Sequence, residues 1–115
     1  LVGEIMLAVD GKTPLEKLQV QNLEDLDGLL IMTINAGFSG QSFMPELLEK
    51  VKTIRSKNLF TSLGEEFPIE VDGGINDQTI KLAKEAGANR FVATSFIFKE
   101  DPKKQYQLLH HIVNE

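Results

Sequence analysis

The candidate binding and catalytic residues lie at three points where an expected strand stops and a segment with glycine or hydroxyl residues begins. These points are the segments 35–40 (NAGFSG), 72–74 (DGG) and 94–95 (TS). Glycines let a backbone approach an anion and turn its N–H groups toward it, and a helix N-terminus adds partial positive charge. One such loop is more simply a tight turn, but three loops after successive strands favour an anion-binding site.

Asp72 is the candidate catalytic group of this sequence. It ends the short strand expected at residues 69–72 and precedes two glycines. Side chains alternate along a strand, so Asp72 lies on the same face as Glu70 and on the opposite face from Val71. If Val71 faces the helices, Asp72 faces the mouth of the barrel. A carboxylate at that place is an acid/base group, a metal ligand or both, although a turn-capping role fits the spacing equally well. Glu70 lies deeper and is interpreted as a structural carboxylate.

Other residues of interest are given structural roles. His110 and His111 are adjacent, so a helix directs them about 100° apart, and they lie far from the strand ends. We expect them to have surface or packing roles. Phe96 and Phe98 are predicted to pack in the core, and the charges of residues 99–104 are predicted to form a solvated face.

Apolar runs alternate with helical patterns along the chain. Strands are expected at residues 5–9, 29–34, 69–72 and 90–93, and helices at 15–21, 45–57, 76–86 and from 102 onward, with a brief turn at 94–98. Alternation of this kind predicts an α/β fold in which crossover helices connect a parallel sheet. Four such units form half of a (β/α)8 barrel or a small open sheet, and periodicity does not decide between them. In both folds the site lies beyond the carboxyl ends of the strands.

The amino-acid composition argues against some kinds of binding partner for this protein. The 115 residues form one domain, with 12 basic and 17 acidic residues and a net charge of −5. This balance argues against binding nucleic acid or an anionic membrane. The absence of cysteine excludes disulfides and thiolate metal sites. The longest apolar run, residues 29–34, is too short to span a bilayer, and we expect a cytoplasmic protein.

Three motifs resemble those of the ribulose-phosphate 3-epimerase family. They are MTINAGFSGQSF at residues 32–43, IEVDGGIN at 69–76, which matches a family signature without a change, and VATSFIF at 92–98. Residues 13–16 (TPLE) also fit the segment that follows the fifth strand of that family. The resemblance implies that residues 1–115 are a (β/α)4 half-barrel, strands five to eight of a TIM-type (β/α)8 fold.

The resemblance also implies a chemistry. Family members interconvert ribulose 5-phosphate and xylulose 5-phosphate: one aspartate removes the proton at C3 and a second returns it on the other face. A divalent metal of the zinc, iron or manganese class holds the enediolate oxygens. Asp72 matches the aspartate that is both metal ligand and acid/base group, and Met32 matches a methionine that lines the site. The positions that match the substrate and phosphate loops are Gly37, Phe38, Ser39, Gly40, Gly73, Gly74, Thr94 and Ser95.

Departures from the family pattern limit what this chain does alone. Ala36 replaces a proline, Ser39 a glycine, and Thr94 a glycine whose N–H faces phosphate; the Thr94 side chain either crowds the phosphate or donates its hydroxyl. The family's second aspartate and two histidine ligands belong to the other half of the barrel. We therefore expect an inactive fragment that forms a homo-oligomer or joins a complementary half-barrel. An allulose 6-phosphate 3-epimerase and a non-catalytic phosphate-binding half-barrel are the alternatives.

Overall fold

The computed structural model of this chain describes residues 3–11, 13–14, 26–34, 43–56 and 67–115. The strands are β1 (Met6–Val9), β2 (Gly28–Met32), β3 (Ile69–Asp72) and β4 (Arg90–Val92). The helices are the 3-10 turn η2 (Pro45–Leu47), α2 (Leu48–Ser56), α3 (Thr79–Ala86), α4 (Ser95–Lys99) and α5 (Pro102–Val113). The helix expected at 15–21 lies outside the described residues.

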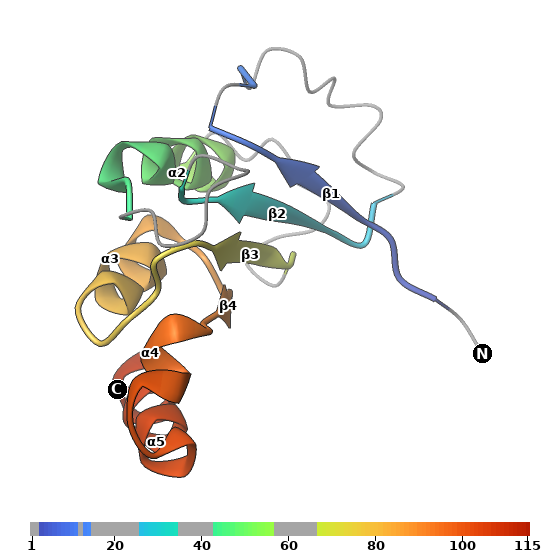
Figure 1. The fold of residues 1–115 in the computed structure, drawn as a ribbon. Helices are drawn as coiled ribbons and strands as arrows, with labels where there is room; N and C mark the ends of the chain where they lie inside the picture. The colour runs from blue at the N-terminus through green and yellow to red at the C-terminus, as the bar shows by residue number, and fades with distance from the viewer. Residues whose placement is uncertain (1–2, 12, 15–25, 35–42, 57–66) are drawn as a thin grey trace.

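The four strands form one parallel sheet in the order β1-β2-β3-β4 (Figure 1). In this sheet Asp72 pairs with Met32 and Val92, and Glu70 pairs with Leu30 and Arg90. Parallel pairing brings the carboxyl ends of all four strands to the same edge. The parallel α/β sheet expected from the alternation of apolar runs is therefore confirmed.

The core lies on one face of the sheet only. Alternate strand residues are buried there together with side chains from three helices: Val9, Leu29, Ile31, Ile69 and Val71 from the strands, and Val51, Ile54, Ile80, Ala83 and Leu109 from α2, α3 and α5. On the opposite face Ala8 is exposed, and Leu30 and Met32 are half-buried. No helix within the described ranges covers that face.

This winding bears on the choice between the two folds that periodicity left open. A doubly wound open sheet places helices on both faces and reverses its strand order, whereas a barrel adds each βα unit in the same direction. Here the strand order does not reverse, and α2, α3 and α5 follow one another along one face. The arrangement is consistent with a segment of a TIM-type barrel.

Local signals set the helix boundaries. Pro45 begins η2, and Asp101 caps α5 by accepting a hydrogen bond from the Lys103 N–H. The Asn76 side chain accepts hydrogen bonds from the Gln78 and Thr79 N–H groups at the start of α3. Gly87 ends α3 with φ 118°, a left-handed conformation that glycine adopts without strain. Each of these signals was visible in the sequence.

Some expected core positions are wrong. The apolar pattern of residues 76–86 predicts a helix face that includes Leu82 beside Ile80, Ala83 and Ala86. Leu82 is exposed, because the buried stripe is Ile80, Ala83 and Ala86. Phe98 is exposed as well, whereas Phe96 packs against the core as expected. Gln105 takes a core-facing position on α5 and donates a hydrogen bond to the Phe96 carbonyl oxygen at 3.0 Å.

Residues 99–104 are all exposed, as expected of a solvated face, and so are His110 and His111. Within the described part of the chain no helix is long and apolar enough to cross a membrane.

Candidate functional site at the carboxyl edge of the sheet

Asp72 lies at the carboxyl end of β3 on the face that the helices leave uncovered. Its neighbour Val71 is fully buried against the helices, so the alternation expected from the sequence is confirmed. Asp72 is half-buried and shares a row with Met32 on β2 and Val92 on β4. Its carboxylate is thus positioned at the edge where parallel α/β folds bind their ligands.

Thr33 fixes the backbone on both sides of the Asp72–Gly73 bond. Its N–H donates to the Asp72 carbonyl oxygen at 2.9 Å, and its hydroxyl donates to the Gly73 carbonyl oxygen at 2.6 Å. The Thr33 carbonyl oxygen in turn accepts from the Met44 N–H at 2.8 Å. Thr33 is completely buried, so water cannot easily replace these hydrogen bonds. They therefore hold the end of β3 in place.

Sequence reasoning missed this role of Thr33. The residue was counted among the apolar run of the second strand, and the partner of its hydroxyl, Gly73, lies 40 residues away. The available signal was a hydroxyl at the end of an otherwise apolar strand, because a buried hydroxyl needs a hydrogen-bond partner.

Gly73 and Gly74 bring the loop after β3 against the segments that flank the loop after β2. Both have positive φ, 128° and 71°. A Cβ at Gly73 would lie 2.8 Å from Cγ1 of Ile34, and one at Gly74 would lie 2.9 Å from the Phe43 backbone. Glycine is needed at both positions for its conformation and for the close approach.

The start of α3 holds the far side of the same turn. The Thr79 hydroxyl donates to the Gly74 carbonyl oxygen at 2.8 Å and accepts from the Asn76 N–H at 2.9 Å. The turn that follows Asp72 is therefore held by Thr33 on one side and by Thr79 on the other. A carboxylate on such a turn loses little conformational freedom when it meets a ligand.

Thr94 and Ser95 follow β4 at the same edge and are exposed. Thr94 has φ −124°, so its backbone does not require glycine, and its carbonyl oxygen accepts from the Phe98 N–H at 3.1 Å. Of the predicted loop residues, Gly37, Phe38, Ser39 and Gly40 lie outside the described residues. The structure thus places Asp72, Met32, Gly73, Gly74, Thr94 and Ser95 at one edge of the sheet.

Lys50 secures the loop after β1 at this edge. Its ammonium group, on α2, donates to the carbonyl oxygens of Asp10 at 2.7 Å and Thr13 at 2.6 Å. The Asp10 carboxylate accepts hydrogen bonds from the Thr13 N–H and hydroxyl, which closes the turn after β1. The contribution of Lys50 was not foreseen, because it joins residues 37 and 40 positions apart.

The described residues do not by themselves fit a divalent metal. Nowhere in those ranges do three or more histidine, cysteine, aspartate or glutamate side chains gather closely enough to hold an ion. Asp72 is one candidate ligand, and a protein site for such a metal uses several. The remaining ligands of the metal implied by the resemblance would have to come from elsewhere.

The parallel sheet has helices on one face, and at its carboxyl edge Asp72 precedes two glycines of positive φ. This arrangement is consistent with barrel-type α/β proteins, whose ligands bind at the strand ends. The fold alone does not specify the ligand.

Comparison with known proteins specifies the family. The family profile described as "Ribulose-phosphate 3 epimerase family" matches residues 3–98. The chain belongs to this family, as its three motifs indicated.

Curated relatives agree with this assignment. A ribulose-phosphate 3-epimerase of Mycobacterium tuberculosis (strain ATCC 25618 / H37Rv) is 43% identical over 96 residues, which are 83% of this chain and 40% of the relative. The cytoplasmic isoform of Oryza sativa subsp. japonica is 46% identical over 88 residues, 75% of this chain and 36% of the relative. The Bacillus subtilis (strain 168) enzyme is 39% identical over 94 residues, 81% of this chain and 42% of the relative. The chain therefore spans about 40% of the length of the curated relatives it matches.

Proposed function

We propose that residues 1–115 are the C-terminal half, strands five to eight, of a ribulose-phosphate 3-epimerase barrel, in which Asp72 exchanges the proton at C3 of a ketose phosphate. The observation that carries this proposal is the position of Asp72. It ends β3 on the uncovered face, and Thr33 and two positive-φ glycines hold its turn in place. Family membership supplies the reaction class.

The chemistry needs two groups on opposite faces of C3. Asp72 accepts the C3 proton on one of its carboxylate oxygens, and the electron pair of the broken C–H bond moves into the enediolate formed with the neighbouring carbonyl. A protonated acid on the other face then delivers a proton to C3, which inverts its configuration. The described residues supply only the first group at this edge, so the second acid belongs to another segment or another chain.

The phosphate end of the substrate would lie over the turns that follow β3 and β4. Gly74 and Ser95 are exposed there, and their N–H groups are the donors we assign to it. A sugar phosphate is the substrate class. Asp72 would be one ligand of the divalent metal that the resemblance implies, and the described residues offer no group of three or more such side chains to hold the ion. A cytoplasmic location is part of the proposal and accords with the rice relative, which is named a cytoplasmic isoform.

The test is a hybrid barrel in which the N-terminal half of the Bacillus subtilis relative precedes residues 1–115 of this chain. We expect the hybrid barrel to convert ribulose 5-phosphate to xylulose 5-phosphate, and the isolated chain to show no turnover, since two-acid chemistry needs both faces. Parallel assays with allulose 6-phosphate test the rival substrate.

Two results would contradict the proposal. One is a hybrid barrel that is folded by circular dichroism and yet inactive on both substrates, which would favour a non-catalytic half-barrel. The other is turnover by the isolated chain that Asp72→Asn abolishes, because it would show that the chain is complete without a second half.

A further inference from the structure

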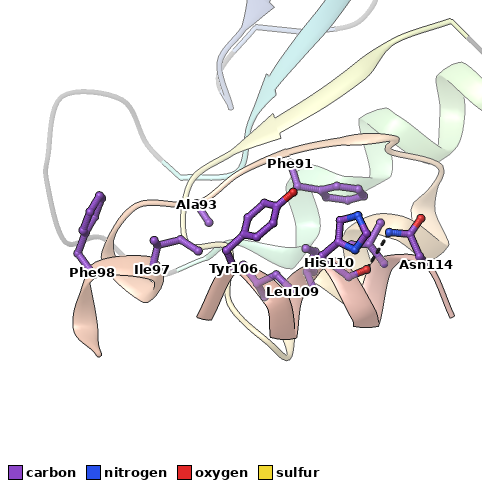
Figure 2. A pocket seen from close by; sticks show the side chains of 10 residues that line it. Phe91, Ala93, Ile97, Phe98, Tyr106, Leu109, His110 and Asn114 are labelled. Atoms are coloured by element: carbon purple, nitrogen blue, oxygen red, sulfur yellow. Dashed lines mark hydrogen bonds between the residues drawn. The ribbon is translucent and has the colours of Figure 1, made fainter. Parts of the chain in front are cut away.

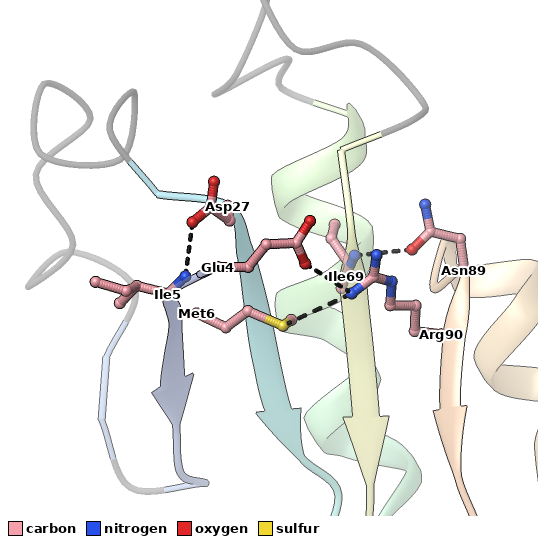
Figure 3. A network of polar contacts seen from close by, with 7 residues as sticks. All are labelled: Glu4, Ile5, Met6, Asp27, Ile69, Asn89 and Arg90. Carbon is pink, nitrogen blue, oxygen red and sulfur yellow. Dashed lines mark hydrogen bonds and ion pairs between the residues drawn. The ribbon is translucent and has the colours of Figure 1, made fainter. Parts of the chain in front are cut away.

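Two surfaces away from the carboxyl edge carry side chains that the proposed function does not use. Beside β4 lies an apolar groove of about 400 Å³, and Phe91, Tyr106 and Leu109 are among the residues that line it (Figure 2). On the uncovered face of the sheet the Arg90 guanidinium lies 4.0 Å from the Glu4 carboxylate, and both side chains are exposed (Figure 3). An exposed ion pair of this length contributes little. A short and fully buried side-chain hydrogen bond is found instead in the turn after β3.

This hydrogen bond determines the direction of a backbone N–H group. The Thr33 hydroxyl donates to the Gly73 carbonyl oxygen at 2.6 Å, and both residues are buried. The Gly73 oxygen belongs to the same peptide group as the N–H of Gly74. A trans peptide group is planar, and its C=O and N–H bonds point in opposite directions. The hydroxyl therefore holds the oxygen on the buried side and directs the Gly74 N–H away from Thr33, and Gly74 is exposed.

The peptide group that follows Gly74 is held as well. The Thr79 hydroxyl donates to the Gly74 carbonyl oxygen at 2.8 Å. Gly74 thus lies between two peptide groups whose oxygens each accept a hydrogen bond from a threonine. Within the described ranges the Gly74 N–H donates to no acceptor. A donor that is fixed in this way binds an anion without first having to be ordered.

The same hydrogen bond also strengthens the donor. A hydrogen bond to the oxygen of a peptide group polarises that group, and the effect is larger where water is excluded. Thr33 is completely buried. Its hydroxyl therefore makes the Gly74 N–H more positive, which favours a negatively charged acceptor.

We infer that Thr33 is a positioning residue for the phosphate end of the substrate. Its buried hydroxyl acts through the Gly73–Gly74 peptide group and aims the Gly74 N–H at a phosphate oxygen. This inference rests on the proposed function, which assigns that N–H to the phosphate. The Thr33 N–H, which donates to the Asp72 carbonyl oxygen, is kept when only the side chain changes. Loss of the hydroxyl should therefore weaken phosphate binding much more than proton transfer.

The first measurement follows the Gly74 N–H signal of the full chain by heteronuclear NMR during titration with inorganic phosphate. In the wild-type chain the proton signal should move downfield, because the N–H comes to donate to an anion. Thr33→Val keeps the shape of the side chain but lacks the hydroxyl, and it should raise the dissociation constant of phosphate at least about fivefold. Thr33→Ser keeps the hydroxyl and should restore binding to within about twofold of the wild-type value.

Two further variants complete the comparison. Thr53→Val makes the same change at a half-buried position on α2, outside the turn, and should alter the dissociation constant less than about twofold. If circular dichroism shows that Thr33→Val does not fold, Thr79→Val takes its place. It frees the Gly74 oxygen and should raise the dissociation constant about two- to fivefold.

The second measurement uses the hybrid barrel. Thr33→Val should raise KM for ribulose 5-phosphate at least about fivefold and leave kcat within about threefold of the parent, because it removes substrate binding and not an interaction made only in the transition state. A variant that only loosened the fold would instead lower kcat through a smaller folded fraction.

Three results overturn the inference. They are a Gly74 signal in the wild-type chain that phosphate does not move, a folded Thr33→Val chain that binds phosphate as tightly as the wild type, and a Thr33→Ser chain that loses as much affinity as Thr33→Val. An active hybrid barrel whose KM is unchanged by Thr33→Val also overturns it and leaves the proposed function intact. A folded but inactive hybrid barrel refutes the proposed reaction, while a phosphate response of Gly74 that depends on the Thr33 hydroxyl still supports the role of Thr33.

Discussion

Gly73 and Gly74 show how single residues position the candidate site. They occupy conformations with φ 128° and 71°, and they bring the turn after Asp72 to within contact of Ile34 and Phe43. The same residue type serves no such purpose at Gly3, where an added Cβ would meet nothing within 4 Å.

Gly74→Ala is therefore expected to lower the free energy of unfolding by about 1–3 kcal/mol, because alanine is strained at positive φ and its methyl group would press on the Phe43 backbone. Urea denaturation followed by circular dichroism measures the change. Gly3→Ala is the control and should be nearly neutral; equal losses for the two variants would show that the close approach at Gly74 contributes nothing.

The position of the candidate catalytic residue was easier to predict than the residues that hold it in place. Asp72 lies where strand alternation places it, because the identity of Val71 as a core residue fixes the face of its neighbour. Thr33 and Lys50 act on groups about 40 residues away. No local sequence pattern predicts a hydrogen bond to a residue so far away in the chain, so these roles are seen only in the folded structure.

At the scale of elements, Arg55 joins three segments of the helix-side layer. From α2 its Nε donates to the Gly87 carbonyl oxygen at the end of α3 at 2.8 Å. Its terminal nitrogen donates to the Phe67 carbonyl oxygen just before β3 at 2.7 Å. The helix end and the strand start are thus held by one guanidinium group.

Arg55→Ala should lower the free energy of unfolding by about 2–4 kcal/mol, because two partly buried carbonyl groups lose charged donors. Lys52→Ala removes a cation from the same helix, but one that forms only an exposed pair with Glu49, and it should cost less than about 0.5 kcal/mol. Thermal melts of the two variants give the comparison, and a loss of similar size in both would refute the role of Arg55.

The ends of the helices could be predicted from local sequence signals. Which side chains of a helix face the core was harder to predict. Asn76, Gly87 and the Asp101–Pro102 pair mark helix ends because capping is a local interaction. Leu82 and Phe98 were misplaced because their apolar character says nothing of which face a neighbouring element covers. Phe98 lines an apolar groove beside β4 together with Phe91, Tyr106 and Leu109.

For the whole molecule, the direction of winding is consistent with a barrel segment. Alternating strands and helices predict either a barrel segment or an open sheet, and the choice depends on whether the crossover helices share one face. Which face the crossover helices cover is determined by packing between elements that are far apart in the chain. The structure shows the strand order unreversed and one face covered, with Asp72 on the other.

The same arrangement makes the site depend on residues that the described part of the chain does not supply. Four strands present one carboxylate at the carboxyl edge of β3, and epimerisation needs an acid on each side of the reacting carbon. We propose that Asp72 is this chain's contribution to the reaction and that Glu70, two residues earlier on the same face of β3, is structural.

The most direct test compares Asp72→Asn with Glu70→Gln in the hybrid barrel, with kcat for ribulose 5-phosphate and the incorporation of solvent deuterium at C3 as readouts. The account predicts that Asp72→Asn lowers both by at least about 100-fold, and that Glu70→Gln leaves kcat within about threefold of the parent. Near-normal turnover and deuterium incorporation in Asp72→Asn, or a larger loss in Glu70→Gln, would contradict it.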